Sequence, residues 1–263
     1  MMTKKILITG GTGGIGCEIT RSLIAAGHTV IIWSRDEEKF LGYKKNLGSK
    51  GKNLFFRKVD VSKEDEVRAA SKDIGEIDIL INSAAVLWPT QSFMDSKIDE
   101  LRRSIDISMW GTIYTCYYLL PQLRLAKRGK IINFSGGGGA NGRKDHMAYS
   151  LSKTALIRFT ENLAIENPEV DVNIIAPGAH KTGMWQDEKC ESAPEKWGSM
   201  EDLINFFNFL VSDQSDGITG KFINYRDDWR SDEFIKKIKE DTDFLTLRRI
   251  DDFQFTKIIK SND

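Results

Sequence analysis

Cysteine pairs and long apolar runs are both missing from this sequence. Its three cysteines, Cys17, Cys116 and Cys190, are odd in number, and no two of them form a CxxC pair. This spacing supplies neither a disulfide framework nor the ligands of a zinc site. A membrane-spanning helix needs about 18 consecutive apolar residues, and no apolar run in this sequence is that long. The residues before Ile6–Ile8 also lack the apolar core of a signal peptide. We therefore expect a soluble, unprocessed protein of the cytoplasm, with no metal site and no membrane partner.

A net charge is also missing. Lysine plus arginine number 38, and so do aspartate plus glutamate, so no overall field attracts nucleic acid or an anionic surface. The sequence contains no internal repeat, low-complexity tract or linker. With 263 residues, 40% of them apolar, the chain can bury one substantial core. We expect a single domain that acts on a small molecule.

Short β-branched runs alternate with longer segments of helical spacing. The expected strands are Lys5–Thr9, Thr29–Trp33, Leu54–Val59, Ile77–Ile81, Lys130–Phe134 and Val170–Ile175, and the expected helices are Ile15–Ala26, Glu37–Asn46, Lys63–Ile74, Asp99–Leu125 and Ala148–Glu166. This alternation predicts an α/β fold with a doubly wound parallel sheet, the Rossmann fold. We expect residues 1–224 to form this domain and residues 225–263 to form a charged C-terminal extension of it, either a helical addition or a partner surface.

A glycine-rich turn, Thr9-Gly-Gly-Thr-Gly-Gly-Ile-Gly16, directly follows the first strand and opens the first helix. Such a turn aims backbone N–H groups and the helix dipole at a phosphate, which predicts binding of a dinucleotide. Much later, Tyr149 and Lys153 stand one turn apart on an expected helix. The lysine cation can stabilise the tyrosine phenolate, so the pair can deliver a proton beside the cofactor. Together the two motifs predict hydride transfer from a nicotinamide.

Several further motifs occur in a fixed order: Asp60-Val61, Asn82-Ser-Ala-Ala85, Tyr149-x-x-x-Lys153 and Asn173-x-x-x-Pro177-Gly-x-x-x-Thr182. With the glycine turn, they make residues 4–224 resemble the single-domain short-chain dehydrogenases/reductases. The resemblance implies that Tyr149 and Lys153 are catalytic and that Lys153 also holds the nicotinamide ribose. The cofactor-binding residues that the motifs imply are Gly10, Thr12, Gly14, Ile15, Gly16, Ser34, Arg35, Asp60, Val61, Asn82, Ala84, Tyr149, Lys153, Pro177, Gly178 and Thr182.

The end of the second expected strand indicates which dinucleotide is bound. Ser34 stands where an acidic residue would bond the ribose 2′-hydroxyl of NAD, and Arg35 follows it. Arginine can bind a 2′-phosphate through a charge-assisted fork. The sequence therefore favours NADP(H), with NAD(H) as the other possible cofactor.

Two positions depart from the family pattern. Counting thirteen residues back from Tyr149, where the family has a carbonyl-polarising serine, reaches Gly136, and the usual asparagine of the proton relay is replaced by Ser108. Loss of a preorganised donor costs about 10²–10³ in rate. Ser135 is the neighbouring candidate donor, although successive strand side chains point to opposite faces. Ser108 and Ser135 are therefore kept as candidate catalytic residues.

Other residues suggest a substrate site. His146 lies near the start of the Tyr149 helix, His180 lies in the loop after Pro177, and either is a possible donor to substrate. Residues 183–198 occupy the place of the family's substrate lid, and their charges favour a polar, sugar-like substrate. The segment Thr219–Arg230 weakly resembles proteins of bacterial surface-polysaccharide pathways.

Two alternative functions stay open. The substituted positions favour, as a rival to a reductase, a dinucleotide-binding regulator or assembly partner with weak catalysis. The glycine turn also fits the spacing Thr9-Gly-x-x-Gly13-x-x-Gly16 of the family's sugar-nucleotide epimerases and dehydratases, although the chain is short for that branch. The resemblance finally implies a homodimer or homotetramer built through the two long helices.

Overall fold

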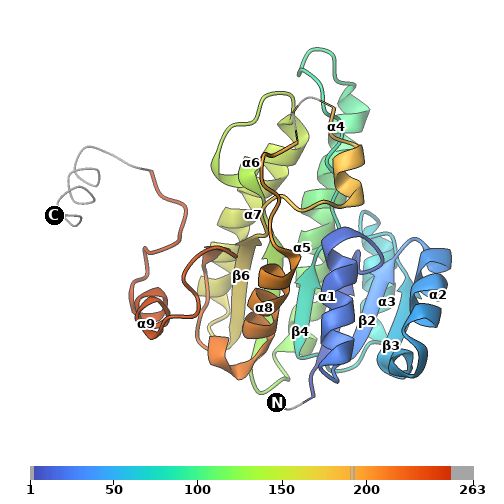
Figure 1. Ribbon diagram of the computed structural model, residues 1–263, viewed down its shortest axis with the longest axis vertical. Coiled ribbons are helices and arrows are strands. Elements are labelled where there is room, and N and C mark those ends of the chain that lie inside the picture. The colour runs from blue at the N-terminus through green and yellow to red at the C-terminus, as the bar shows by residue number, and fades with distance from the viewer. Residues whose placement is uncertain (1–2, 190, 192, 250–263) are drawn as a thin grey trace.

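The computed structural model describes residues 3–189, 191 and 193–249, and these form one parallel sheet covered by helices on both faces (Figure 1). The strands are β1 (Lys5–Thr9), β2 (Thr29–Ser34), β3 (Leu54–Lys58), β4 (Ile79–Asn82), β5 (Gly129–Phe134), β6 (Val170–Ala176) and β7 (Phe222–Asn224). Their order in the sheet is β3-β2-β1-β4-β5-β6-β7. The predicted doubly wound α/β fold is confirmed, and β7 is a strand that the sequence patterns missed.

The helices pack in two layers. The α-helices are α1 (Gly14–Ala25), α2 (Glu37–Asn46), α3 (Glu64–Lys72), α4 (Ile98–Ile105), α5 (Gly111–Leu123), α6 (Gly137–Ala140), α7 (Met147–Glu166), α8 (Met200–Val211) and α9 (Asp232–Glu240). Apolar residues of α1 and α8 share one buried cluster with the sheet, whereas those of α3 and α5 share another with its opposite face. No helix among the described residues is long and apolar enough to cross a bilayer.

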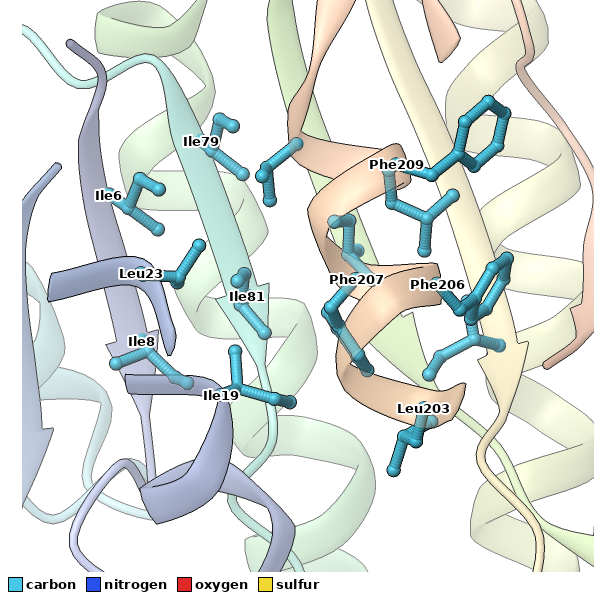
Figure 2. Close-up of a cluster of buried hydrophobic side chains, with 14 of the residues drawn as sticks. Ile6, Ile8, Ile19, Leu23, Ile79, Ile81, Leu203, Phe206, Phe207 and Phe209 are labelled. Atoms are coloured by element: carbon cyan, nitrogen blue, oxygen red, sulfur yellow. The ribbon is translucent and has the colours of Figure 1, made fainter. Parts of the chain in front are cut away.

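The core between α1, α8 and the sheet holds the glycine turn in place. Figure 2 shows Ile6 and Ile8 of β1 on the side of the strand where Ile19 and Leu23 of α1 lie, with Phe207 of α8 across from them in the same cluster. Ile6, Ile8 and Ile19 are fully buried. Burial of one such side chain is worth about 1.5–3 kcal/mol, so this cluster fixes the angle at which β1 leads into α1.

The expected single helix Asp99–Leu125 is interrupted. A π-helical turn, Asp106–Trp110, separates α4 from α5, and α5 ends at Leu123, two residues after Pro121. A π-turn inserts one extra residue and is common at functional sites. Here the turn contains Ser108, whose hydroxyl accepts a hydrogen bond from the backbone N–H of Val86 at 3.2 Å. Periodicity did not reveal the break, because both flanking helices have helical spacing.

The expected C-terminal extension is partly helical. After β7 the chain forms a turn around Trp229 and then α9, whose Ile238 is fully buried against the core that also contains α8. Residues 250–263 of the expected extension lie outside the described residues. Residues 225–249 thus add to the main core, and we propose that they belong to the same domain as residues 1–224.

Candidate functional site

One long cavity of about 1820 Å³ runs across the carboxyl ends of the strands. In a doubly wound sheet this is the edge at which ligands bind. The cavity is lined by the glycine turn after β1, by Arg35 after β2, and by Tyr149 and Lys153 of α7. The structure therefore brings the expected dinucleotide motif and the expected proton-transfer pair to one continuous site, although about 130 residues separate them in the chain.

The glycine turn has the backbone of an anion-binding loop. Gly10 has φ +69° and Gly14 has φ +51°, conformations that L side chains rarely adopt. Gly14 is also the first residue of α1, so the N-terminal N–H groups of this helix open toward the cavity. Gly16 does not line the cavity; a Cβ there would lie 2.7 Å from the carbonyl oxygen of Gly10, so this glycine allows close packing of the turn.

Two basic residues, Arg35 and Lys58, stand at the end of the cavity beside β2 and β3, where the acidic residues 36–38 also line it. Arg35 is exposed and lines it, together with Lys58, which lies opposite Ser34 in the β2–β3 register. Thr12 and Ser34 share a hydrogen bond of 2.9 Å that joins the glycine turn to the end of β2. Lys58 was missed by sequence reasoning, because only the strand register places it beside Ser34.

The other expected cofactor residues divide into two groups. Asp60, Val61, Ala84, Pro177, Gly178 and Thr182 line the cavity. Asn82, however, is 3% exposed and lies in the interior, where its side-chain amide donates to Asn133 Oδ1 at 2.9 Å and its oxygen accepts from Thr115 at 2.7 Å. Asn82 therefore ties the end of β4 to β5 and α5, and it does not reach the cavity surface.

Tyr149 occupies the space that the missing serine would use. A Cβ added at Gly136 would overlap the Tyr149 hydroxyl. Gly136 is fully extended, with φ 178°, so its backbone alone does not require glycine. Burial raises the pKa of the Tyr149 phenol, and the nearby Arg143 guanidinium opposes this increase. Gly136 thus removes a hydroxyl donor and at the same time lets the tyrosine hydroxyl approach the backbone.

Lys153 lies next to this tyrosine. Its Nζ is 5.8 Å from the centroid of the Tyr149 ring and donates a hydrogen bond of 2.8 Å to the carbonyl oxygen of Phe134. An ammonium group has three donors, so this bond fixes Lys153 and leaves donors for a ligand. Burial lowers the pKa of Lys153 to about 8.

The hydroxyls of the two serines proposed as replacements bond backbone groups, although Ser135 itself lines the cavity. Ser135 Oγ lies under α6, where a Cβ added at Gly139 would overlap it, and it donates only a long bond of 3.4 Å to the carbonyl of Gly136. Ser108 is fully buried against the backbone of Val86 and does not line the cavity. Alternation along β5 explains the orientation of Ser135. The structure brings neither hydroxyl to the place of the missing donor.

Both histidine side chains face protein carbonyl or carboxylate groups. The Nδ1 atom of His146 lies 2.6 Å from the carbonyl of Lys144, and its Nε2 lies 2.7 Å from Glu188 Oε2. His180 Nε2 lies 2.7 Å from the carbonyl of Pro177, while its Nδ1 is buried with no hydrogen-bond partner among the described atoms. His146 therefore has no nitrogen left for substrate, and only His180, which lines the cavity, retains one.

A charged cluster joins the expected lid to the start of α7. Arg143 bonds Glu188 at 3.0 Å and Glu191 at 2.7 Å, and its guanidinium lies 5.7 Å from the Tyr149 ring centroid. The Glu188 side chain is 1% exposed. An ion pair that is largely removed from water is costly to break on one side. Arg143 was missed from the sequence because nothing in its local pattern indicates these partners.

The family model described as short chain dehydrogenase matches residues 4–193. L-Fucose dehydrogenase of Oryctolagus cuniculus is 31% identical over 190 residues, which cover 70% of this chain and 65% of that protein's length. The 2-dehydro-3-deoxy-D-gluconate 5-dehydrogenase of Formosa agariphila is 28% identical over 238 residues, which cover 84% of this chain and 90% of that protein.

Solved structures agree with this match. The structure of ElxO with NADP bound has a TM-score of 0.76 and 27% identity, covering 85% of this chain and 97% of that one. A short chain dehydrogenase from Shigella flexneri complexed with NADP has a TM-score of 0.79, covering 84% and 96%, and at 24% identity it supports the fold alone. With the family model covering most of the chain, this protein belongs to the short-chain dehydrogenase/reductase family of oxidoreductases.

Proposed function

We propose that this protein is an NADP(H)-dependent oxidoreductase that interconverts a carbonyl and an alcohol on a polar, sugar-like small molecule. The observation that carries the proposal is the single cavity that joins Arg35, the glycine turn and the Tyr149–Lys153 pair. The residues present fit a dinucleotide, because left-handed glycines and the α1 N-terminus form a phosphate cradle and basic side chains stand at one end. A bound nicotinamide would supply the hydride.

The chain's own groups would handle the proton. In carbonyl reduction, the Tyr149 hydroxyl donates its proton to the carbonyl oxygen, and the resulting phenolate is stabilised by the Lys153 ammonium beside it. Phe134 holds that ammonium in place through its carbonyl. Arg143 adds a second positive charge close to the Tyr149 ring. The polarising serine of other family members has no counterpart here, so the proposed mechanism depends on these two cations.

Two observations favour a sugar-like substrate. The cavity lining includes polar and charged side chains as well as apolar ones, among them Asn141, Arg143 and Asp227. Two relatives are named for sugar derivatives, an L-fucose dehydrogenase and a 2-dehydro-3-deoxy-D-gluconate 5-dehydrogenase, although others are named for diacetyl and 3-oxoacyl groups. A screen of keto-sugars and simple ketones for nicotinamide oxidation tests this proposal, and turnover confined to acyl substrates would contradict it.

A second candidate function is dinucleotide binding without efficient turnover, as in a redox-responsive regulator. It is favoured by Gly136 and by the orientation of Ser108 and Ser135, which leave the tyrosine without a neighbouring hydroxyl donor. One experiment distinguishes the two candidates. If the protein binds NADPH tightly and none of the carbonyl compounds in the screen causes NADPH oxidation, the result supports the regulator.

Charge reversal at Arg35 should change cofactor preference. In the Arg35→Glu variant we expect NADPH to bind about 10- to 100-fold more weakly, since a hydrogen bond to a charged group is worth about 1.5–3 kcal/mol. NADH should lose little affinity, because it has no 2′-phosphate. Calorimetric titration with both cofactors measures the effect. Arg21→Glu on α1, outside the cavity, is the matched control, and an equal loss for NADPH and NADH at Arg35 would contradict the assignment.

The pH dependence of reduction should follow Lys153. Because burial lowers its pKa from 10.5 to about 8, the side chain is charged below pH 8 and neutral above it. The pKa of Tyr149 is raised, so the tyrosine stays protonated over this range. We expect kcat/KM for reduction to be level below about pH 8 and to fall above it. In the Lys153→Arg variant the guanidinium stays charged, so the fall in kcat/KM should move to higher pH. If the fall in kcat/KM stays at the same pH, a group other than Lys153 causes it.

We also propose a homo-oligomer formed through α5 and α7. Tyr117 and Leu151 on these helices are 72% and 53% exposed, and Trp110, in the π-helical turn before α5, is 42% exposed. Large exposed apolar side chains in one region are typical of interaction surfaces. Sedimentation analysis should therefore give at least a dimer, and Tyr117→Glu with Leu151→Glu should shift it toward the monomer. A monomeric unmodified protein would contradict this proposal.

A further inference from the structure

The chain after α9 turns back to the free edge of the sheet. We call residues 241–248 the C-terminal segment. The backbone N–H of Phe222 in β7 donates to the carbonyl of Leu245 at 2.7 Å, and Lys221 Nζ donates to the carbonyls of Asp241 and Phe244 at 2.6 and 2.9 Å. Figure 1 shows α9, in orange-red, at the side of the molecule away from α2 and β3. The segment thus covers the edge of β7.

The same segment is also attached to α7. The N–H of Leu247 donates to Glu161 Oε1 at 2.6 Å, and Arg158 donates to the carbonyl of Leu247 at 2.7 Å. Arg248 lies 3.8 Å from Glu161, whose side chain is 5% exposed. The segment therefore crosses from the edge strand to the helix that carries Tyr149 and is held at both ends.

Between these attachments the segment enters the cavity. Leu245 and Thr246 line the same cavity as Tyr149, together with Phe222 and Asn224 of β7. β7 is at the opposite edge of the sheet from β3, the strand that carries Lys58, so this part of the cavity is far from the basic end. Leu245 has φ +56°, a left-handed conformation that a leucine adopts only where its surroundings hold it.

We propose that Leu245 and Thr246 form a wall of the substrate site and limit the size of the carbonyl compound that reaches Tyr149. This inference rests on the proposed reductase function and extends it to the C-terminal segment. Leu245, which also packs against the main core, supplies the apolar part of this wall. Thr246 lines the cavity and donates its hydroxyl proton to the carbonyl of Asp243, so its oxygen can still accept a hydrogen bond. A polyhydroxy carbonyl compound offers the hydroxyl donor that such an acceptor binds.

The proposed wall can be tested by replacing one of its residues, Thr246, with cysteine and attaching a removable label there. Thr246→Cys is made in a background of Cys17→Ser and Cys190→Ser, with the buried Cys116 left in place. Thr242→Cys is the matched control, because Thr242 belongs to the same segment, is exposed and does not line the cavity. Each variant is labelled with a methanethiosulfonate nitroxide, and dithiothreitol removes the label. Turnover is measured with dihydroxyacetone and with hexuloses, and NADPH affinity is measured in parallel.

The label at Thr246→Cys should raise KM for a hexulose by about tenfold or more, as expected for steric mismatch in a pocket, and less for dihydroxyacetone. NADPH affinity should not change, and removal of the label should restore KM. A second readout needs no turnover: the nitroxide should quench the fluorescence of bound NADPH at Thr246→Cys and not at Thr242→Cys. If the unlabelled protein reduces no carbonyl compound, the proposed function is wrong. The quenching measurement then still shows whether Thr246 lies beside the bound cofactor. Equal behaviour of the two labelled variants in both readouts overturns the inference.

Discussion

Replacement of Tyr149 by phenylalanine should lower kcat for carbonyl reduction by about 10²–10⁴, the usual contribution of a positioned general acid. The ring would still fill its buried position between Lys153 and Arg143, because the change removes one oxygen atom only. NADPH affinity should therefore stay within about twofold, since the lost group contacts the reacting oxygen and not the phosphates. Stopped-flow measurement of NADPH oxidation and calorimetric titration give the two quantities.

Tyr118→Phe provides the matched control for this change. The Tyr118 hydroxyl bonds Glu64 on α3 and lies outside the cavity, so its loss should leave both kcat and NADPH affinity unchanged. Unchanged turnover in Tyr149→Phe would show that Tyr149 is not the general acid of the reaction. A protein in which NADPH affinity and turnover fall together would instead indicate that the tyrosine holds the cofactor.

Addition of a single methyl group at Gly136 should have the second large effect. In Gly136→Ala the new Cβ would overlap the Tyr149 hydroxyl, so the tyrosine must move away from its present position. A misplacement of about 1 Å at a reacting group can cost about 10²-fold in rate. We therefore expect kcat to fall by about 10², with NADPH affinity retained. Pre-steady-state measurement of the hydride-transfer step separates this loss from slow product release.

Gly137→Ala is the control for Gly136→Ala, because a Cβ at Gly137 meets no atom within 4 Å. It should leave kcat unchanged. Gly136→Ser adds the same carbon and also the hydroxyl found in other family members, so it should be more active than Gly136→Ala if a donor to the developing oxyanion is useful here. Full activity in Gly136→Ala would mean that Tyr149 works from a different position than the one in this structure.

Local sequence determined the fold and the outline of the site. Alternating β-branched and helical patterns gave six of the seven strands, because side-chain periodicity follows directly from backbone geometry. β7 was missed because it has only three residues, Phe222–Asn224, too few for a periodic signal. The glycine turn and the Tyr149–Lys153 pair could be identified because each is a short motif whose chemistry depends on neighbouring residues.

Tertiary structure alone decided which side chains face the cavity. Asn82 belongs to a predicted motif, yet it binds Asn133 in the interior, since orientation depends on the packing of separate elements. Ser135 lines the cavity, but its hydroxyl lies under α6. Arg143 and Leu245 carry no local signal, because their roles come from partners distant in the chain. The sequence by itself thus determined the α/β architecture and the chemical type of the site. The contact of the Tyr149 hydroxyl with Gly136 and the place of Leu245 and Thr246 in the cavity lining depend on long-range packing, which no local pattern encodes.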